Sequence, residues 1–193
     1  MSATCCPNYD GEALPPLRAL EDNWVFYIGS FSKILAPALR VGWVIVPEPL
    51  VSVLSALKEG SDINTATFAQ RTIATYLETG HLTDHITVLR QEYRSRRDAM
   101  LHAVTRYFPA GTRCFQPRHG MFLWVELSTA VDMEALLKAA VEQKKVAFVP
   151  GLAFSVKKNH AVDRSIRLNF SLCDPERIVQ GIILLGELLS ELA

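Results

Sequence analysis

Hydrophobic and polar positions predict strands and then helices over the first 80 residues. Residues 24–28 and 41–46 are short apolar runs with many β-branched and aromatic side chains, which is typical of buried strands. Pro47 is tolerated in the first turn of a helix, so we expect a helix from there to about Gly60. A second helix is expected from Thr65 to Glu78, and the proline-rich, acidic residues 7–22 favour a loop.

A long amphipathic helix is predicted from about Thr83 to Tyr107. Its apolar residues recur at intervals of three, four or seven, which places them on one helical face. They are Ile86, Leu89, Tyr93, Met100, Val104 and Tyr107. Such a helix is long enough to link two domains. The arginines at 94, 96 and 97 form a basic cluster on it, which we expect to be a solvated face.

Beyond Pro109 the pattern predicts an α+β arrangement. Strands are expected at 121–127, 146–149 and 165–170, and helices at 133–143 and 175–192. Asp174 precedes the last helix and is a predicted N-cap. Strands separated by helices indicate one layer of sheet with helices on one face.

Composition narrows the function without deciding it. The chain has 20 basic and 20 acidic residues, so its charge indicates neither a nucleic-acid nor a membrane partner. Four cysteines without CxxC spacing, and histidines without convergent spacing, predict no metal site and no disulfide framework. Free thiols are usual in a reducing cytoplasm, which is the expected location. No apolar run approaches the roughly 18 residues of a membrane span.

Lys33 is the first residue with candidate chemistry. It stands in a serine-rich turn between the two predicted strands, with Ser30 and Ser32 before it and Arg40 after it. An amine becomes a nucleophile toward a carbonyl when desolvation or a nearby cation lowers its pKa. Arg40 offers that cation and a two-pronged contact for a phosphate, to which the serines add hydroxyl donors. The alternative is an ordinary solvated lysine.

Arg167 is the second candidate, because it interrupts the apolar strand 166–170. A guanidinium in such a strand must be paired or face a cavity, since an unpaired buried charge is costly. Residue types alone leave a satisfied edge-strand arginine as the alternative.

Several colinear segments resemble the fold-type I pyridoxal-phosphate aminotransferases. The stretch Ser30 to Trp43 resembles their cofactor-lysine segment, in the branch that contains 2-aminoadipate and kynurenine aminotransferases and the aminotransferase-like domains of MocR-type regulators. Further matches are Gly80 to Leu82, Tyr93 to Met100, Gly120 to Leu127, Val146 to Gly151 and Ile166 to Ser171.

The resemblance implies an α/β fold that corresponds to the C-terminal half of these enzymes. Residues 1–80 would be the end of the large cofactor-binding domain, which would be incomplete. Residues 81–108 would be the long linking helix, and residues 109–193 the small C-terminal α+β domain.

It also implies roles for the candidate residues. Lys33 would be the catalytic residue that holds pyridoxal 5'-phosphate, with Ser30, Ser32 and Arg40 at the phosphate. Arg167 would hold the substrate's α-carboxylate in a fork-to-fork contact. The reaction implied is the transfer of an amino group from an amino acid to a 2-oxo acid, in a homodimer.

One part of the family's site has no counterpart in the chain. Matching residues 9–12 to the family's equivalent segment places the aspartate for the ring nitrogen at about position 1 and a tyrosine at about position 3, where the chain has Met1 and Ala3. We therefore expect a truncated aminotransferase that is inactive alone and leaves an apolar face uncovered at residues 24–46. The alternatives are a cofactor- or amino-acid-sensing domain of a MocR-type regulator, and a noncatalytic fragment or interaction protein.

Overall fold

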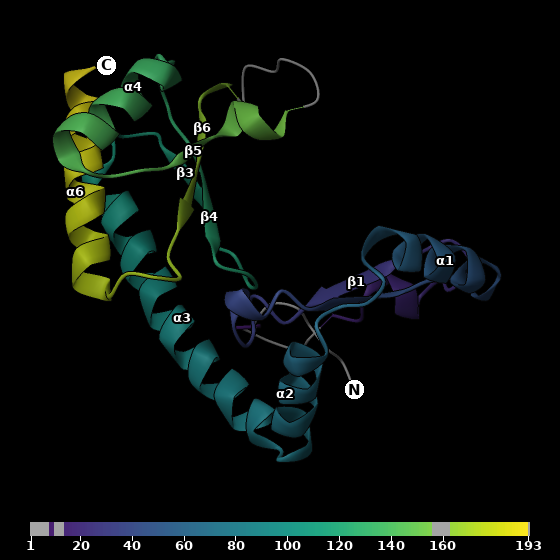
Figure 1. Cartoon of the computed structure of the whole chain (residues 1–193). Helices are drawn as coiled ribbons and strands as arrows, with labels where there is room; N and C mark the ends of the chain where they lie inside the picture. Colours follow the sequence, from purple (N-terminus) through teal and green to yellow (C-terminus); the bar gives the residue numbers. More distant parts are fainter. Residues whose placement is uncertain (1–7, 10–13, 156–162, 193) are drawn as a thin grey trace. The chain divides into compact units, whose positions relative to one another are not determined.

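The chain consists of two compact units, residues 1–90 and 91–193. The structure is a computed structural model that describes residues 8–9, 14–155 and 163–192 (Figure 1). The boundary between the units lies inside the long helix α3 (His81–Tyr107). The division at residues 80 and 108 that the resemblance implies stays a prediction.

The first unit contains a two-stranded antiparallel sheet. Strand β1 (Tyr27–Ser30) pairs with β2 (Gly42–Ile45) so that Gly29 faces Trp43. A Cβ on Gly29 would lie 2.1 Å from the Trp43 ring, so only glycine allows the indole to cover the strand. Arg18 of the short 3₁₀ helix η1 (Leu17–Ala19) donates hydrogen bonds to the Val25 carbonyl at 2.7 Å and to the Val46 carbonyl at 3.3 Å.

Helices follow the sheet much as the apolar pattern predicts. A 3₁₀ turn, η3 (Glu48–Leu50), leads into α1 (Val51–Asp62), and α2 (Thr67–Glu78) comes next. Helix α3 begins two residues before the predicted start and ends at Tyr107 as predicted.

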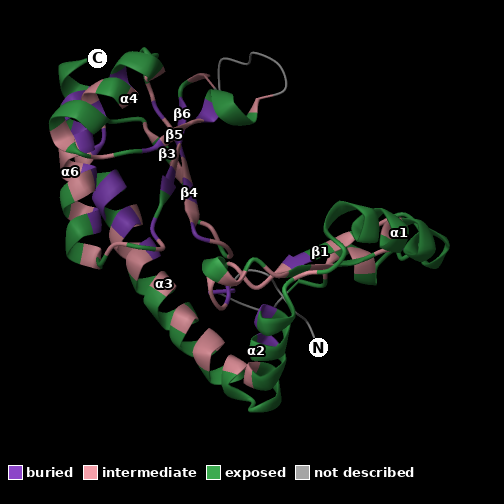
Figure 2. Cartoon of the chain, viewed as in Figure 1, coloured by how far each residue is buried: buried purple, intermediate pink, exposed green. Residues whose placement is uncertain are grey.

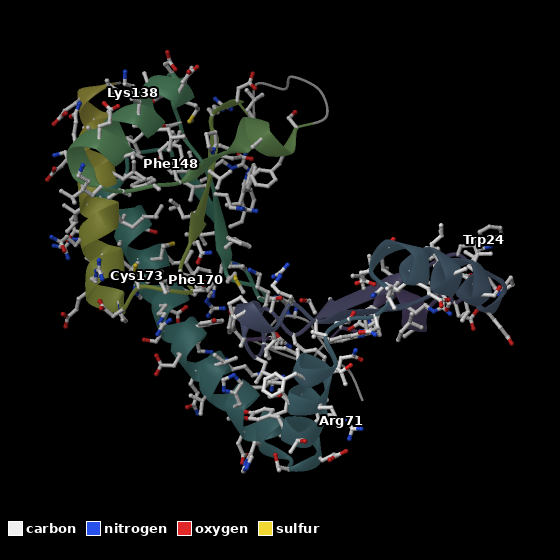
Figure 3. All side chains as sticks on the ribbon, in the orientation of Figure 1. Trp24, Arg71, Lys138, Phe148, Phe170 and Cys173 are labelled. Carbon is white, nitrogen blue, oxygen red and sulfur yellow. The ribbon has the colours of Figure 1, made fainter. Side chains whose placement is uncertain are left out.

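The strands of the first unit are not buried, which corrects the prediction for residues 24–28 and 41–46. Trp24, just before β1, is 87% exposed (Figure 3), and Ile28 in β1 is 73% exposed, although Gly29 in the same strand is buried. The cause is that only two strands pair here within the described residues, so no second layer covers them. The expected uncovered apolar face is therefore present.

The second unit is built on a four-stranded antiparallel sheet. Its order is β3-β4-β6-β5, and its strands are β3 (Arg113–Phe115), β4 (Phe122–Glu126), β5 (Val149–Pro150) and β6 (Ser165–Asn169). Strand β3 has only three residues and no hydrophobic alternation, which is why the pattern did not predict it. Strand β5 is shorter than the predicted 146–149 and starts at its last residue.

One face of this sheet forms the main hydrophobic core. Leu123, Val125 and Ile166 are fully buried, together with Leu185 on the last helix, α6 (Pro175–Glu191) (Figure 2). Helix α4 (Met133–Ala139), which continues into a π turn at Ala140–Lys144, adds the buried Leu136. The opposite face carries Phe122, Trp124 and Arg167, because side chains alternate along a strand. The predicted sheet with helices on one face is confirmed.

Helix α6 starts and packs for identifiable reasons. Asp174 is its N-cap, as predicted, and its carboxylate accepts a hydrogen bond from the Arg177 amide at 2.8 Å. Farther along, the buried Gly186 lets α6 approach the end of α3. A Cβ there would lie 2.3 Å from the Tyr107 carbonyl oxygen.

The basic cluster on α3 is a solvated face only at Arg94, which is exposed; Arg96 is half-buried and Arg97 is buried, which corrects the prediction for these two. The Arg97 side chain is 2% exposed, and it binds the carboxylate of Asp98 at 2.8 Å and the Pro117 carbonyl at 3.0 Å. Arg96 donates to the Ser171 carbonyl at 2.5 Å. A pattern of charges does not reveal that two distant loops bring their carbonyl oxygens to this helix.

We expect Gly186→Ala to destabilise the chain. Gly181→Ala, a substitution in the same helix, should not destabilise it. At Gly181 the nearest atom to a new Cβ is a Val146 methyl at 3.9 Å, an ordinary contact. Gly181→Ala should therefore raise stability by up to about 1 kcal/mol through helix propensity. Gly186→Ala should lower it by roughly 1–3 kcal/mol, because the obstacle is backbone. Urea unfolding of both variants measures the difference, and equal stabilisation would contradict the close approach.

Candidate active site

Lys33 lies in a tightly hydrogen-bonded turn between β1 and β2. The Phe31 carbonyl accepts hydrogen bonds from the amides of Ile34, Leu35 and Ala36, at 3.3, 2.8 and 3.2 Å. Ile34 is 5% exposed and anchors the turn, while Lys33 beside it is exposed. The turn therefore fixes the backbone of Lys33 and leaves its amine accessible.

Arg40 returns its side chain to the same turn. Its backbone is left-handed, with φ of 52°, and it ends the 3₁₀ helix η2 (Pro37–Leu39) just before β2. The guanidinium lies 3.5 Å from the Ser32 hydroxyl and donates to the Pro37 carbonyl at 3.3 Å. The Ser30 hydroxyl oxygen accepts from the Ser32 amide at 3.1 Å, which leaves its own proton to donate.

The turn thus brings together the four residues that the sequence singles out in this region. Its hydrogen-bond donors are the hydroxyls of Ser30 and Ser32, the exposed amine of Lys33 and the guanidinium of Arg40. This guanidinium makes no ion pair with a carboxylate among the described residues. This donor set suits a phosphate group next to an amine, so the residues present fit pyridoxal 5'-phosphate.

Arg167 belongs to the second unit and has a different environment. On β6 it lies between Trp124 of β4 and Val149 of β5. Its guanidinium carbon lies 4.1 Å from the centre of the Phe122 ring and 4.4 Å from that of Phe154. Two aromatic faces therefore hold the charged plane, an arrangement that stabilises a cation with little water around it.

The guanidinium lacks a complete set of partners. Its Nε is buried and makes no hydrogen bond in the described part of the chain. The group borders a cavity of about 180 Å³ that Phe122, Phe148 and Val149 also line. A buried donor without a partner is costly, which favours a ligand acceptor at this position, and the role of Arg167 stays a prediction. A bound carboxylate would supply the missing acceptor.

The sequence did not reveal the two rings around Arg167. Phe122 shares a sheet face with Trp124, and strand alternation offered that signal. Phe154 comes from the 3₁₀ helix η5 (Gly151–Phe154), and its ring lies 5.9 Å from that of Trp124. Only the folded chain brings it to Arg167.

Among the described residues, the other reactive side chains form no second centre. Cys114 faces the same side of the sheet as Val125, its partner on β4, and burial raises the pKa of its thiol to about 11. It is therefore a poor nucleophile at neutral pH. Within residues 8–9, 14–155 and 163–192 no group of three acidic, histidine or cysteine side chains could hold a metal ion. Positions 1 and 3, where the ring-nitrogen aspartate and its tyrosine were expected, lie outside the described residues, as does most of the segment 9–12.

Comparison with known families identifies the family of the chain. The family described as Aminotransferase class I and II matches residues 9–182. The chain belongs to this family. Aromatic-amino-acid aminotransferase 1 of Thermococcus litoralis is 39% identical over 184 residues, which are 95% of the chain and 43% of that relative.

A solved aminotransferase and a regulator extend the comparison. The crystal structure of LysN, an α-aminoadipate aminotransferase of Thermus thermophilus complexed with N-(5'-phosphopyridoxyl)-L-leucine, has a TM-score of 0.86 and 32% identity. The match covers 96% of the chain and 48% of that structure. An uncharacterized HTH-type transcriptional regulator, YdfD of Bacillus subtilis, is 30% identical over 92% of the chain and 36% of its own length.

These findings confirm the resemblance and the α/β aminotransferase fold that it implies. The chain spans less than half the length of each of these three relatives. None of the described helices is both long and apolar enough to cross a membrane.

Proposed function

We propose that the chain is part of a pyridoxal-phosphate-dependent aminotransferase that moves an amino group from an amino acid to a 2-oxo acid. The observation that carries the proposal is the turn that contains Lys33, in which the Arg40 guanidinium lies 3.5 Å from the Ser32 hydroxyl and the Ser32 amide donates to the Ser30 hydroxyl oxygen. Family membership supports it, since LysN was solved with a phosphopyridoxyl amino acid.

Each residue of the turn has a distinct part in this proposal. Arg40, Ser30 and Ser32 bind the phosphate and so hold the cofactor in one position. When bound, pyridoxal 5'-phosphate supplies an electrophilic aldehyde and a ring that accepts electrons. The Lys33 amine would hold the cofactor through its aldehyde, and as a free amine it would accept the proton from the α-carbon of the substrate.

Arg167 orients the substrate in the same proposal. Its planar guanidinium offers two parallel N–H donors to an α-carboxylate. The rings of Phe122 and Phe154 lie against the guanidinium and restrict its orientation. A carboxylate held in this way fixes the direction of the bond to be broken at the α-carbon.

A second function follows from the similarity to YdfD. In a MocR-type regulator the same residues would sense the cofactor or an amino acid without turnover. A noncatalytic fragment or interaction protein would bind neither. Homodimer formation, a cytoplasmic location and the absence of nucleic-acid and membrane partners stay predictions.

We expect pyridoxal phosphate to label Lys33 selectively. After incubation and borohydride reduction, peptide mapping should find the adduct on Lys33 far more often than on Lys58 or Lys138. Arg40→Ala should lower this labelling because it removes the cation at the phosphate. Lys58→Gln is the matched control, since Lys58 is paired with Asp62 on α1. Uniform labelling of surface lysines would contradict the assignment.

We expect Arg167→Ala to lower kcat/KM for amino acids in an enzyme reconstituted to activity. The loss should be roughly 2–5 kcal/mol, because the substrate carboxylate would have no partner. Arg167→Lys should recover only part of it, since an ammonium lacks the planar fork. Arg164→Ala removes an exposed arginine from the same segment and is the control. Unchanged kinetics in Arg167→Ala would leave the arginine a purely structural role.

We expect these 193 residues alone to show no turnover. The chain matches less than half of each relative, and the apolar strands β1 and β2 are uncovered. The assay offers 2-aminoadipate, kynurenine, leucine and aromatic amino acids with 2-oxoglutarate. A hydrophobic dye should bind the same preparation. Turnover at ordinary enzyme rates of about 1–1,000 per second would overturn this expectation.

A further inference from the structure

A second cavity of this unit lies outside the Arg167 site. It has a volume of about 350 Å³ and lies between α6, β6 and the chain that follows the π turn Ala140–Lys144. Met100, Leu168 and Ile182 form part of its wall, and each is at most 4% exposed. Arg167 is not among its lining residues, although Ala147 and Asn169 border both cavities.

The charged side chains at this cavity all have one sign. They are Lys144, Lys145 and Arg177, and no carboxylate is among the described lining residues. The charge of Lys144 is already balanced, because its Nζ lies 2.9 Å from the Glu187 carboxylate. This hydrogen bond raises the pKa of Lys144, so the amine stays protonated in the ion pair. The positive charge available to a ligand therefore comes from the other two.

Arg177 and Lys145 are exposed side chains at this cavity, and neither makes an ion pair with a described residue. The Arg177 amide bonds to Asp174 at the start of α6, while its guanidinium makes no ion pair or hydrogen bond with any described residue. Lys145 has left-handed backbone geometry, with φ of 56°, and its Nζ donates only to the Glu142 carbonyl, at 3.1 Å. Both cations retain donors for an anion.

We propose that this cavity binds a small organic anion with an apolar body. A carboxylate head binds Arg177 and Lys145, and the body lies on Val146, Ala147 and Leu184, which line the cavity and are not buried. The volume is at the lower end of the roughly 300–1,000 Å³ of ligand sites, which suits a short aliphatic acid. The site is separate from the proposed substrate site and does not depend on the proposed function.

Cys173 provides a direct readout, because it lines this cavity (Figure 3). Octanoate is the probe, and the rate of Cys173 alkylation by iodoacetamide at pH 8 is followed by peptide mapping. With a Kd of about 1 mM, octanoate at twice that concentration should slow the reaction roughly threefold, by the factor 1 + [L]/Kd. Cys114, which is outside the cavity and has a pKa of about 11, should react at an unchanged slow rate and so report that the unit stays folded.

Variants separate this site from its alternatives. Arg177→Gln and Lys145→Asn should each weaken the protection, with asparagine chosen because it tolerates the left-handed backbone. Lys138→Gln, on the exposed side of α4, and Arg167→Gln should leave it intact. Each variant is compared with its own rate without octanoate. Equal protection of Cys173 by 1-octanol and by octanoate would overturn the proposal. Loss of the octanoate protection in Arg167→Gln would also overturn it, as would the absence of protection by octanoate at about ten times 1 mM.

Discussion

The register between β4 and β6 is the constraint on which the second unit depends. Leu123 pairs with Leu168 and Trp124 with Arg167, so hydrophobic residues face the helices while the arginine faces the other way. A slip by one residue would exchange the faces, placing a guanidinium in the core and leucines at the site. The same pairing therefore builds the core and positions Arg167, the proposed carboxylate-binding residue.

Helix α3 supports this sheet from its C-terminal half. Arg97 holds the carbonyl of Pro117, in the loop before β4, and Arg96 holds that of Ser171, just after β6. Gly186 lets α6 lie against the Tyr107 carbonyl at the end of the same helix. Arg97 and Arg96 thus hold the two loops that precede Phe122 and follow β6. Substitutions there would disturb the site without touching a ligand.

The two cationic sites of the second unit differ in how much desolvation they impose. Arg167 is held between two aromatic rings with its Nε unsatisfied, which favours a tightly oriented carboxylate. Arg177 is an exposed side chain at the rim of a larger apolar cavity, where charge selects the sign of the ligand and apolar contact supplies most of the affinity. The first geometry suits catalysis and the second suits reversible binding.

The sequence by itself determined the helices, the N-cap at Asp174, the family and the residues with candidate chemistry. These follow from local periodicity, from turn and cap preferences, and from colinear motifs, all of which are legible along one chain. It did not determine the exposure of Trp24 and Ile28, the burial of Arg97 or the short strand β3. Those depend on which distant segments meet. Only the tertiary structure decides the burial of a side chain, because burial depends on several segments together. The same holds for the cation–π contact of Arg167 with Phe154 and for the missing hydrogen-bond partner of the Arg167 Nε.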